Sequence, residues 1–181
     1  MRIFPSSRIA FGTFLFLLAA GLGAQNLHWK LYNNPNEGFS ASFPSLPDVQ
    51  KKSFETAGGT FELRTYSASA GDSTMMVGVC DYGPIVAQKR AQEVLLGAKN
   101  SALANLSSRL ANERHISLGK NQGIEFEAVS DSTRYSARMY LVETTLYELL
   151  VASPLGHPSD QTKRFLDSFQ LINRTKDNSG E

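Results

Sequence analysis

The chain has 181 residues, with 18 Lys and Arg against 17 Asp and Glu, and a single cysteine. This near-neutral balance excludes a strongly basic surface for nucleic acid or anionic lipid. With one cysteine no intramolecular disulfide can form, so the fold depends on an ordinary hydrophobic core.

The N-terminus has the pattern of a secretory signal peptide, predicted over residues 1–24. Arg2 and Arg8 precede an apolar run from Ile9 to Leu22, and the small residues Gly23 and Ala24 follow it. The alternative is an uncleaved membrane anchor, but the run is shorter than the ~20 residues that a bilayer core requires. No cysteine directly follows the run, so we expect cleavage after Ala24 and a soluble periplasmic or secreted chain without a lipid anchor.

The predicted mature chain has 157 residues (181 minus 24), the usual size of one domain. Removal of the two arginines leaves 16 basic against 17 acidic side chains. We predict one folded domain over residues 25–173 and a disordered tail over residues 174–181, which has no apolar anchor.

Alternating apolar and polar residues predict strands throughout the first half of the mature chain. Prolines at 44 and 47 end one strand, and glycines at 58, 59 and 71 mark turns. In the strand predicted over residues 74–82, Cys80 shares one face with Met76, while Val77 and Val79 share the other. Both faces of this strand should therefore be covered. We predict strands over residues 28–32, 39–43, 60–69 and 74–82, with the chain restarting at Leu46 toward Phe54.

A long amphipathic helix is predicted over residues 87–111. Arg109 falls on its apolar stripe, in the last turn, where a cation complements the helix dipole. Gly97 marks either a point of close packing or an exposed position. At ~1.5 Å per residue the helix would run roughly 37 Å and cross a whole sheet. Its apolar stripe consists of Ala87, Ala91, Val94, Leu95, Ala98, Ala102, Leu106 and Leu110.

The second half repeats the strand pattern and ends in a short helix. In the last strand Glu148 is the only interruption of an apolar run, which is typical of an interior strand. Ser159 or Asp160 can cap the final helix. We predict strands near Ile116 and Leu118 and over residues 124–128, 133–142 and 146–153, and a helix that buries Phe165, Leu166 and Phe169.

The predicted class is α+β in a single domain. About seven strands joined by short turns favour an antiparallel sheet. We expect this sheet to lie between the long central helix and the shorter C-terminal helix.

The segment from Gly38 to Pro44, with Pro47 after it and Trp29 and Tyr32 before it, resembles the opening of small exported proteins of the PsbP-like superfamily. The resemblance extends from Leu27 to Ile172. It is a pattern of order and spacing without a catalytic signature, and it implies an antiparallel sheet between helices. Members of this superfamily include an extrinsic photosystem subunit, a Ran-binding import factor and bacterial envelope proteins, which bind partners or act as accessories.

The sequence offers few candidates for chemistry. His28, His115 and His157 are scattered, without the spacing of metal ligands. Cys80 with a histidine is a possible nucleophile pair, but its apolar strand favours an inert packing residue. No catalytic, metal-binding or cofactor-binding residue is assigned, and no cofactor is expected.

Two polar strand faces carry alternative interpretations. Glu125 and Glu127 form either a paired-carboxylate site or an ordinary solvated face. Arg134 and Arg138, with Tyr140 beside them, form either a patch for an anionic or carbohydrate partner or a set of cross-strand ion pairs with those glutamates, which we favour.

We therefore expect an exported, non-catalytic binding or accessory protein of the bacterial cell envelope. Its partner, a protein or another envelope component, would contact loops 33–38 and 119–123. The alternative is a hydrolase or transferase whose site is assembled only in three dimensions. The sequence assigns no oligomeric state.

Overall fold

The computed structural model describes residues 28–56, 59–87, 89–156 and 160–175. The predicted signal peptide, its cleavage site and His157 lie outside the described residues. The elements in chain order are β1 (Lys30–Asn34), β2 (Phe39–Phe43), β3 (Asp48–Thr56), β4 (Gly59–Ala70), β5 (Ser73–Asp81), α1 (Pro84–Ala87), α2 (Ala91–Asn105), β6 (Arg109–Leu118), β7 (Asn121–Val129), β8 (Thr133–Val142), β9 (Thr145–Pro154), α3 (Asp160–Asp167) and β10 (Gln170–Leu171).

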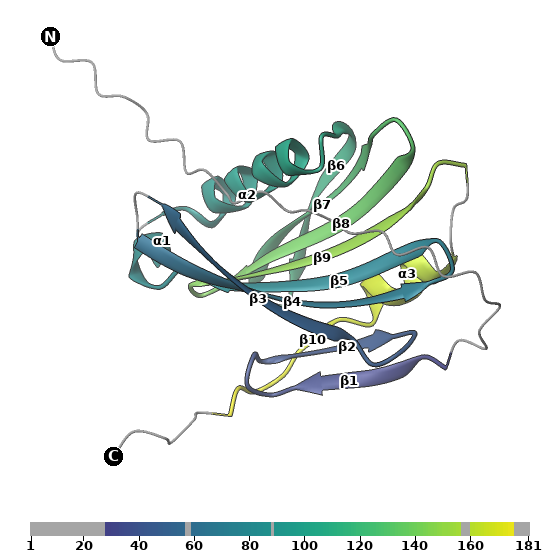
Figure 1. Ribbon diagram of the computed structural model, residues 1–181. Helices are drawn as coiled ribbons and strands as arrows, with labels where there is room; N and C mark the ends of the chain where they lie inside the picture. The colour runs from purple at the N-terminus through teal and green to yellow at the C-terminus, as the bar shows by residue number, and fades with distance from the viewer. Residues whose placement is uncertain (1–27, 57–58, 88, 157–159, 176–181) are drawn as a thin grey trace, which may run out of the picture.

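Seven of these strands form one antiparallel sheet in the order β3-β4-β5-β9-β8-β7-β6. The two predicted β halves meet where β5 pairs with β9, with Gly78 opposite Glu148 (Figure 1). Tight turns make this order possible, and Gly71 and Gly119 adopt left-handed backbone conformations in two of them, at φ 58° and 60°. The predicted α+β class with about seven antiparallel strands is confirmed.

A second sheet of three strands, in the order β1-β2-β10, lies apart from the first. Figure 1 shows it below the large sheet, on the side of α3. The sequence predicted β1 and β2 but did not predict that they form a sheet separate from the large one. The two-residue β10 was not predicted at all. Its backbone pairs with Ser40 and Phe39 of β2, so the end of the domain closes onto its beginning.

The central helix is shorter than predicted. α2 has 15 residues, about 22 Å at the usual rise, and ends with Leu106 as its C-cap. Ser107 then takes a left-handed conformation at φ 47°, and its N–H and that of Ser108 bond back to the carbonyls of Ala104 and Leu103. This is the hydrogen-bond pattern of a Schellman motif, with serine where glycine is usual.

The placement of Arg109 and Leu110 on the helix was therefore wrong. Both belong to β6, opposite Val129 and Ala128 of β7. A helical apolar spacing continued by chance across the Schellman turn, and the pairing of nine residues with β7 decided the strand.

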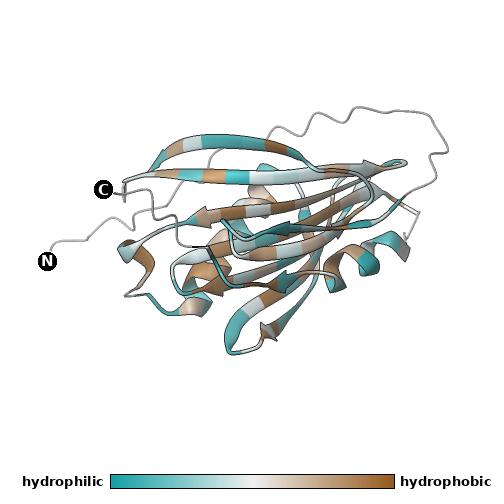
Figure 2. Cartoon of the chain, turned by 90° about the horizontal axis from the view of Figure 1, so that it is seen from below, coloured by the Kyte–Doolittle hydropathy of each residue, from teal (hydrophilic) through white to brown (hydrophobic). Residues whose placement is uncertain are grey.

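The two faces of the large sheet have separate hydrophobic cores. One contains Val77, Val79 and the α3 residues Phe165 and Leu166. The other contains Met76, Cys80 and the buried α2 residues Val94, Leu95, Ala98 and Ala102, as the stripe predicted. Figure 2 shows brown and teal positions alternating along several strands. Helices α2 and α3 therefore pack on opposite faces, while α2 covers only part of its face.

Lys99 of α2 is a buried cation that the sequence did not single out, with 4% exposure. Its ammonium forms an ion pair with the carboxylate of Glu113 on the edge strand β6. Gly97, by contrast, is exposed, and a Cβ added there would meet nothing within 4 Å. Of the two interpretations of Gly97, the structure supports the exposed position.

Candidate functional site

The predicted arginine patch is an ion-pair cluster. Arg138 Nε lies 2.6 Å from Glu125 Oε2, Arg114 Nη2 lies 2.6 Å from Glu125 Oε1, and Arg134 Nη1 lies 3.3 Å from Glu127. Burial opposes ionisation of Glu125, but hydrogen bonds from Arg138 and Arg114 outweigh it and lower its pKa. The cross-strand pairing that we favoured is confirmed, and these arginines are not a free anion-binding patch.

The predicted contact loop 33–38 is tied into the core through Glu37. This side chain is 5% exposed, and its Oε1 lies 2.8 Å from Arg64 Nε. Tyr66 donates a hydrogen bond to the same oxygen at 3.3 Å, and the Tyr147 hydroxyl donates to the Glu37 carbonyl at 2.6 Å. The loop therefore has a structural role that its turn-forming sequence concealed.

The first residues of the predicted tail, Arg174 and Thr175, contact the same region. Arg174 donates from Nε to the Glu37 carbonyl at 3.3 Å, and from Nη2 to Thr145 Oγ1 at 3.1 Å. The N–H of Thr175 donates to the Pro35 carbonyl at 3.0 Å. The tail was expected to lack an anchor, yet these two residues have one. Residues 176–181 lie outside the described residues.

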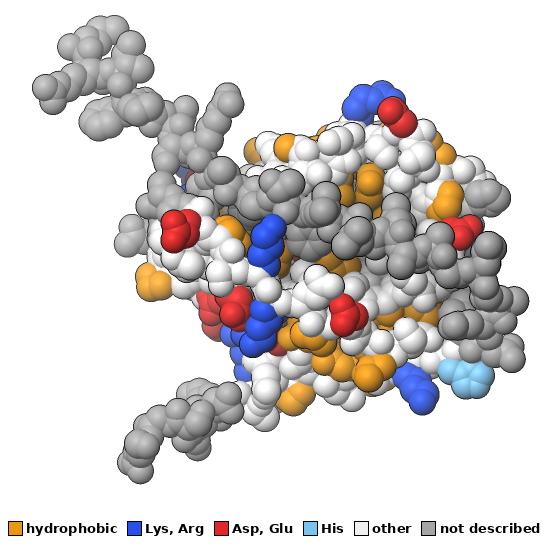
Figure 3. Space-filling model, viewed as in Figure 1, with side chains coloured by type: hydrophobic (Ala, Val, Ile, Leu, Met, Phe, Trp, Pro, Cys, Tyr) orange, Lys and Arg blue, Asp and Glu red, His pale blue; other side chains and the backbone are white. Residues whose placement is uncertain are grey.

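No group of three or more potential metal ligands occurs among the described residues. His28 lies just before β1 of the small sheet, and His115 lies on β6 of the large sheet. Figure 3 shows basic and acidic side chains interspersed on the displayed face, without a large region of one sign.

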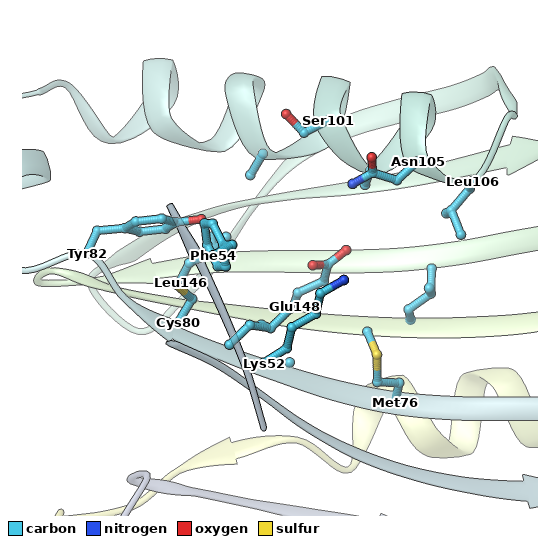
Figure 4. Close-up of a pocket in the computed structure, with 15 residues that line it drawn as sticks. Lys52, Phe54, Met76, Cys80, Tyr82, Ser101, Asn105, Leu106, Leu146 and Glu148 are labelled. Atoms are coloured by element: carbon cyan, nitrogen blue, oxygen red, sulfur yellow. The ribbon is translucent and has the colours of Figure 1, made fainter. Parts of the chain in front are cut away.

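A pocket lies between α2 and the part of the sheet formed by β3, β4, β5 and β9, and we call it the α2 pocket (Figure 4). It encloses about 60 Å³. Most of its wall is apolar, and Lys52, Ser101, Asn105 and Glu148 supply polar groups. Its lining residues are Lys52, Phe54, Leu63, Met76, Gly78, Cys80, Tyr82, Ala98, Ser101, Ala102, Asn105, Leu106, Leu146, Glu148 and Leu150.

Small residues on facing elements create the hollow. Gly78 on β5 has no side chain, and the α2 residues above the sheet include Ala98 and Ala102. A Cβ added to Gly78 would lie 3.5 Å from Leu63 Cδ1, which is an ordinary contact distance. The sheet side of the α2 pocket is therefore not crowded at Gly78. The pocket therefore follows from missing side-chain volume at three positions and not from a distortion of the backbone.

Glu148 is the one carboxylate in this lining. It projects from the middle of β9 toward α2, and Figure 4 draws the side-chain nitrogen of Lys52 beside its carboxylate. The Glu148 side chain is half-buried, and this burial raises its pKa to about 7. An ionised carboxylate is disfavoured in such surroundings, so Glu148 exchanges its proton near neutral pH. Sequence analysis noted this residue only as the interruption of an apolar run, and that interruption was the signal for the pocket.

Cys80 is a buried free thiol with 2% exposure, as its apolar strand indicated. Burial raises its pKa to about 11, and a hydrogen bond with Tyr82 opposes this only in part. Burial likewise raises the pKa of Tyr82. At neutral pH the pocket therefore presents an uncharged thiol and phenol, and the thiol lacks the thiolate character that a nucleophile needs.

The arrangement suits binding better than reaction. Its carboxylate could accept a proton, but the cysteine nearby is not ionised at neutral pH. An apolar wall with one polar anchor is the usual make-up of a small-molecule site.

An antiparallel seven-stranded sheet with α2 on one face and α3 on the other defines an α+β protein. No protein-family model matches the chain, and no curated protein matches it. Among solved structures, the chain is similar to a cyanobacterial PsbP (CyanoP) from Synechocystis sp. PCC 6803, with a TM-score of 0.56 and 11% identity, covering 86% of this chain and 99% of that one. The protein therefore has a PsbP-like fold, as the opening strands predicted. At this identity the likeness concerns the fold.

Proposed function

We propose that the protein is an exported accessory protein of the cell envelope that acts by binding, and that the α2 pocket is its binding site. One observation carries the proposal: the large sheet and α2 leave an apolar hollow around a single carboxylate. Placing an ionisable group largely out of water is costly, so the position of Glu148 in a hollow favours a functional role.

Export and envelope location are supported by the N-terminal sequence pattern. In the part of the chain that the structure describes, no helix is long and apolar enough to cross a membrane. Localisation in the periplasm or outside the cell is part of the proposal and can be checked by the mass of exported material, which should begin at Gln25.

An enzyme remains the second candidate, because a carboxyl group with a pKa of about 7 in a cleft is a suitable general base. The neighbouring thiol argues against it, since burial keeps Cys80 protonated. Turnover of a hydrolase or transferase substrate that is lost in Glu148→Gln, with the fold intact, would establish the enzyme and contradict the binding proposal.

The binding proposal is tested with two matched substitutions on α2. Ala102→Leu fills the α2 pocket, and Ala104→Leu adds the same volume on the exposed side of the helix. Mature wild-type protein and both variants would be used to capture components from the native envelope.

A component retained by wild type and by Ala104→Leu but lost with Ala102→Leu would support the α2 pocket as the binding site. Equal retention by all three proteins would contradict it. Circular dichroism and thermal unfolding would show that both variants are folded.

A further inference from the structure

We propose that the α2 pocket binds a small apolar molecule that carries a primary amine, with the ammonium group against the carboxylate of Glu148 and the apolar body between α2 and the sheet. This inference rests on the proposed function of the α2 pocket as a binding site. It adds the chemical class of the ligand.

The first argument is the placement of Glu148. It stands opposite Gly78 in the register of β9 and β5, so no side chain from that β5 position lies beside it. The α2 residues that line the pocket are all uncharged, including Ser101 and Asn105. From β4 the pocket receives only Leu63. A ligand entering beneath α2 therefore meets two charged side chains, the carboxylate of Glu148 and the ammonium of Lys52 on β3.

The second argument is charge. Besides Glu148, the titratable groups of the lining are Lys52 of β3, Cys80 of β5 and Tyr82 after β5. Cys80 and Tyr82 are neutral at neutral pH because burial raises the pKa of each. A cation next to Glu148 favours its ionised form and offsets the cost of its burial. An anionic ligand would place like charges together, and a neutral one would leave that cost in place.

Lys52 is the only cation of the lining, and it lies on the edge strand β3 with an exposed side chain. Its ammonium carries the same charge as the proposed ligand, so it weakens binding by repulsion and by competition for the carboxylate. Loss of this cation should therefore increase the affinity for an amine, whereas it should decrease the affinity for an anion.

The third argument is size. A volume of about 60 Å³ exceeds the ~10–15 Å³ that one water molecule needs by several fold. Short side chains at Gly78, Ala98 and Ala102 leave room for a short alkyl chain or a single ring. Large polar ligands such as oligosaccharides and nucleotides do not fit this space and find few polar partners in it.

The experiment compares three probes of one length: hexylamine, hexanol and hexanoate. Binding to the full mature protein is measured by calorimetry at about pH 8, where Glu148 is ionised, and at about pH 5.5, where it is protonated. The proteins are wild type, Glu148→Gln, Lys52→Gln, Ala102→Leu and the matched control Ala104→Leu. Thermal unfolding of each verifies its fold.

We expect hexylamine to bind wild type more tightly than hexanol or hexanoate at about pH 8, and at least about tenfold more weakly to Glu148→Gln, since a hydrogen bond to a charged group is lost. Acidification should weaken hexylamine binding and leave hexanol unchanged. Lys52→Gln should tighten hexylamine binding, Ala102→Leu should abolish it, and Ala104→Leu should match wild type.

Equal affinity of wild type and Glu148→Gln for hexylamine, or tighter binding of hexanoate than of hexylamine, would overturn the inference. If hexanol or hexanoate is preferred and Ala102→Leu abolishes its binding, the amine is wrong while the α2 pocket stands as a binding site. If none of the probes binds wild type, the amine inference falls, and the capture experiment decides separately on the proposed function.

Discussion

Glu37 and Glu148 lie on opposite faces of the large sheet, and their carboxylates have different surroundings. Beside the small sheet, Glu37 has Arg64 and Tyr66 within 2.8 and 3.3 Å of one oxygen. Beneath α2, Glu148 lies in an apolar hollow, where burial raises its pKa. One carboxylate is held by partners that stabilise its charge, while the charge of the other weakens the fold.

The two faces also differ in how tightly their side chains fill the space. The face beside the small sheet is an aromatic cluster, in which Phe169 stacks on Tyr140 at 6.0 Å and on Phe39 at 5.9 Å between ring centroids. The α2 face has Gly78, Ala98 and Ala102 at its pocket. The first face is filled by aromatic rings and the second leaves the α2 pocket open, so we expect substitutions of the two carboxylates to act in opposite directions.

The largest expected effect comes from the aromatic face. Phe39 is fully buried and contacts the rings of Tyr66 and Phe169. Phe39→Ala should lower the free energy of unfolding by about 3–5 kcal/mol, because it removes a ring and leaves a cavity. Urea unfolding measures this loss. A change under about 1 kcal/mol would show that this face is not the main source of stability.

The second prediction concerns Glu148 and pH. Its pKa rises from 4.5 to about 7 on folding, so the folded state keeps the proton that the unfolded state loses in this range. Stability should therefore fall by roughly 3 kcal/mol as pH rises from about 4.5 to about 7. Glu148→Gln should remove this fall and be more stable than wild type at about pH 8.

Urea unfolding of both proteins at several pH values gives the difference, in which the titration of other groups cancels. A difference that does not vary with pH would mean that Glu148 is as well solvated in the folded state as in the unfolded state.

The third prediction uses Glu37 as the counterpart. Glu37→Gln keeps the shape of the side chain but removes the charge that faces Arg64. It should destabilise the protein by about 2 kcal/mol at neutral pH, since a largely buried ion pair loses one partner. The same substitution thus stabilises one face and destabilises the other. Equilibrium unfolding at one pH is sufficient, and a stabilised Glu37→Gln would refute the contrast between the faces.

The smallest effect is expected at Gly97, on the exposed side of α2. An added Cβ meets nothing within 4 Å, and alanine is the better helix former. Gly97→Ala should stabilise the protein by about 0.5–1 kcal/mol without changing ligand affinity. A shift of the thermal midpoint measures this gain. Any loss of stability would show that this position packs against something that the structure does not include.

Much of the fold could be predicted from the sequence because strand periodicity is a local property. Residues 39–43 and 133–142 were predicted with the bounds of β2 and β8, and the alternating faces of β5 were assigned correctly. These patterns persist because a strand that buries one or two faces must show it in neighbouring residues. The resemblance of the opening strands to PsbP-like proteins also held at the level of the fold.

The end of α2 could not be predicted in the same way. The apolar spacing runs on through Leu106 to Leu110, and no glycine marks the turn at Ser107. Helix and strand were both compatible with the local residues there. The pairing of β6 with β7 decided between them, and that pairing depends on residues up to twenty positions away.

The sequence by itself determined the class of the fold, the faces of most strands and the apolar stripe of α2. The tertiary structure alone decided which polar residues are partnered and where space remains. Glu37 and Arg64 come from a loop and from β4 and form an ion pair, while Gly78, Ala102 and Glu148 come from three elements and enclose a hollow. Volume and electrostatic environment are properties of several chain segments at once, so no single stretch of sequence carries them.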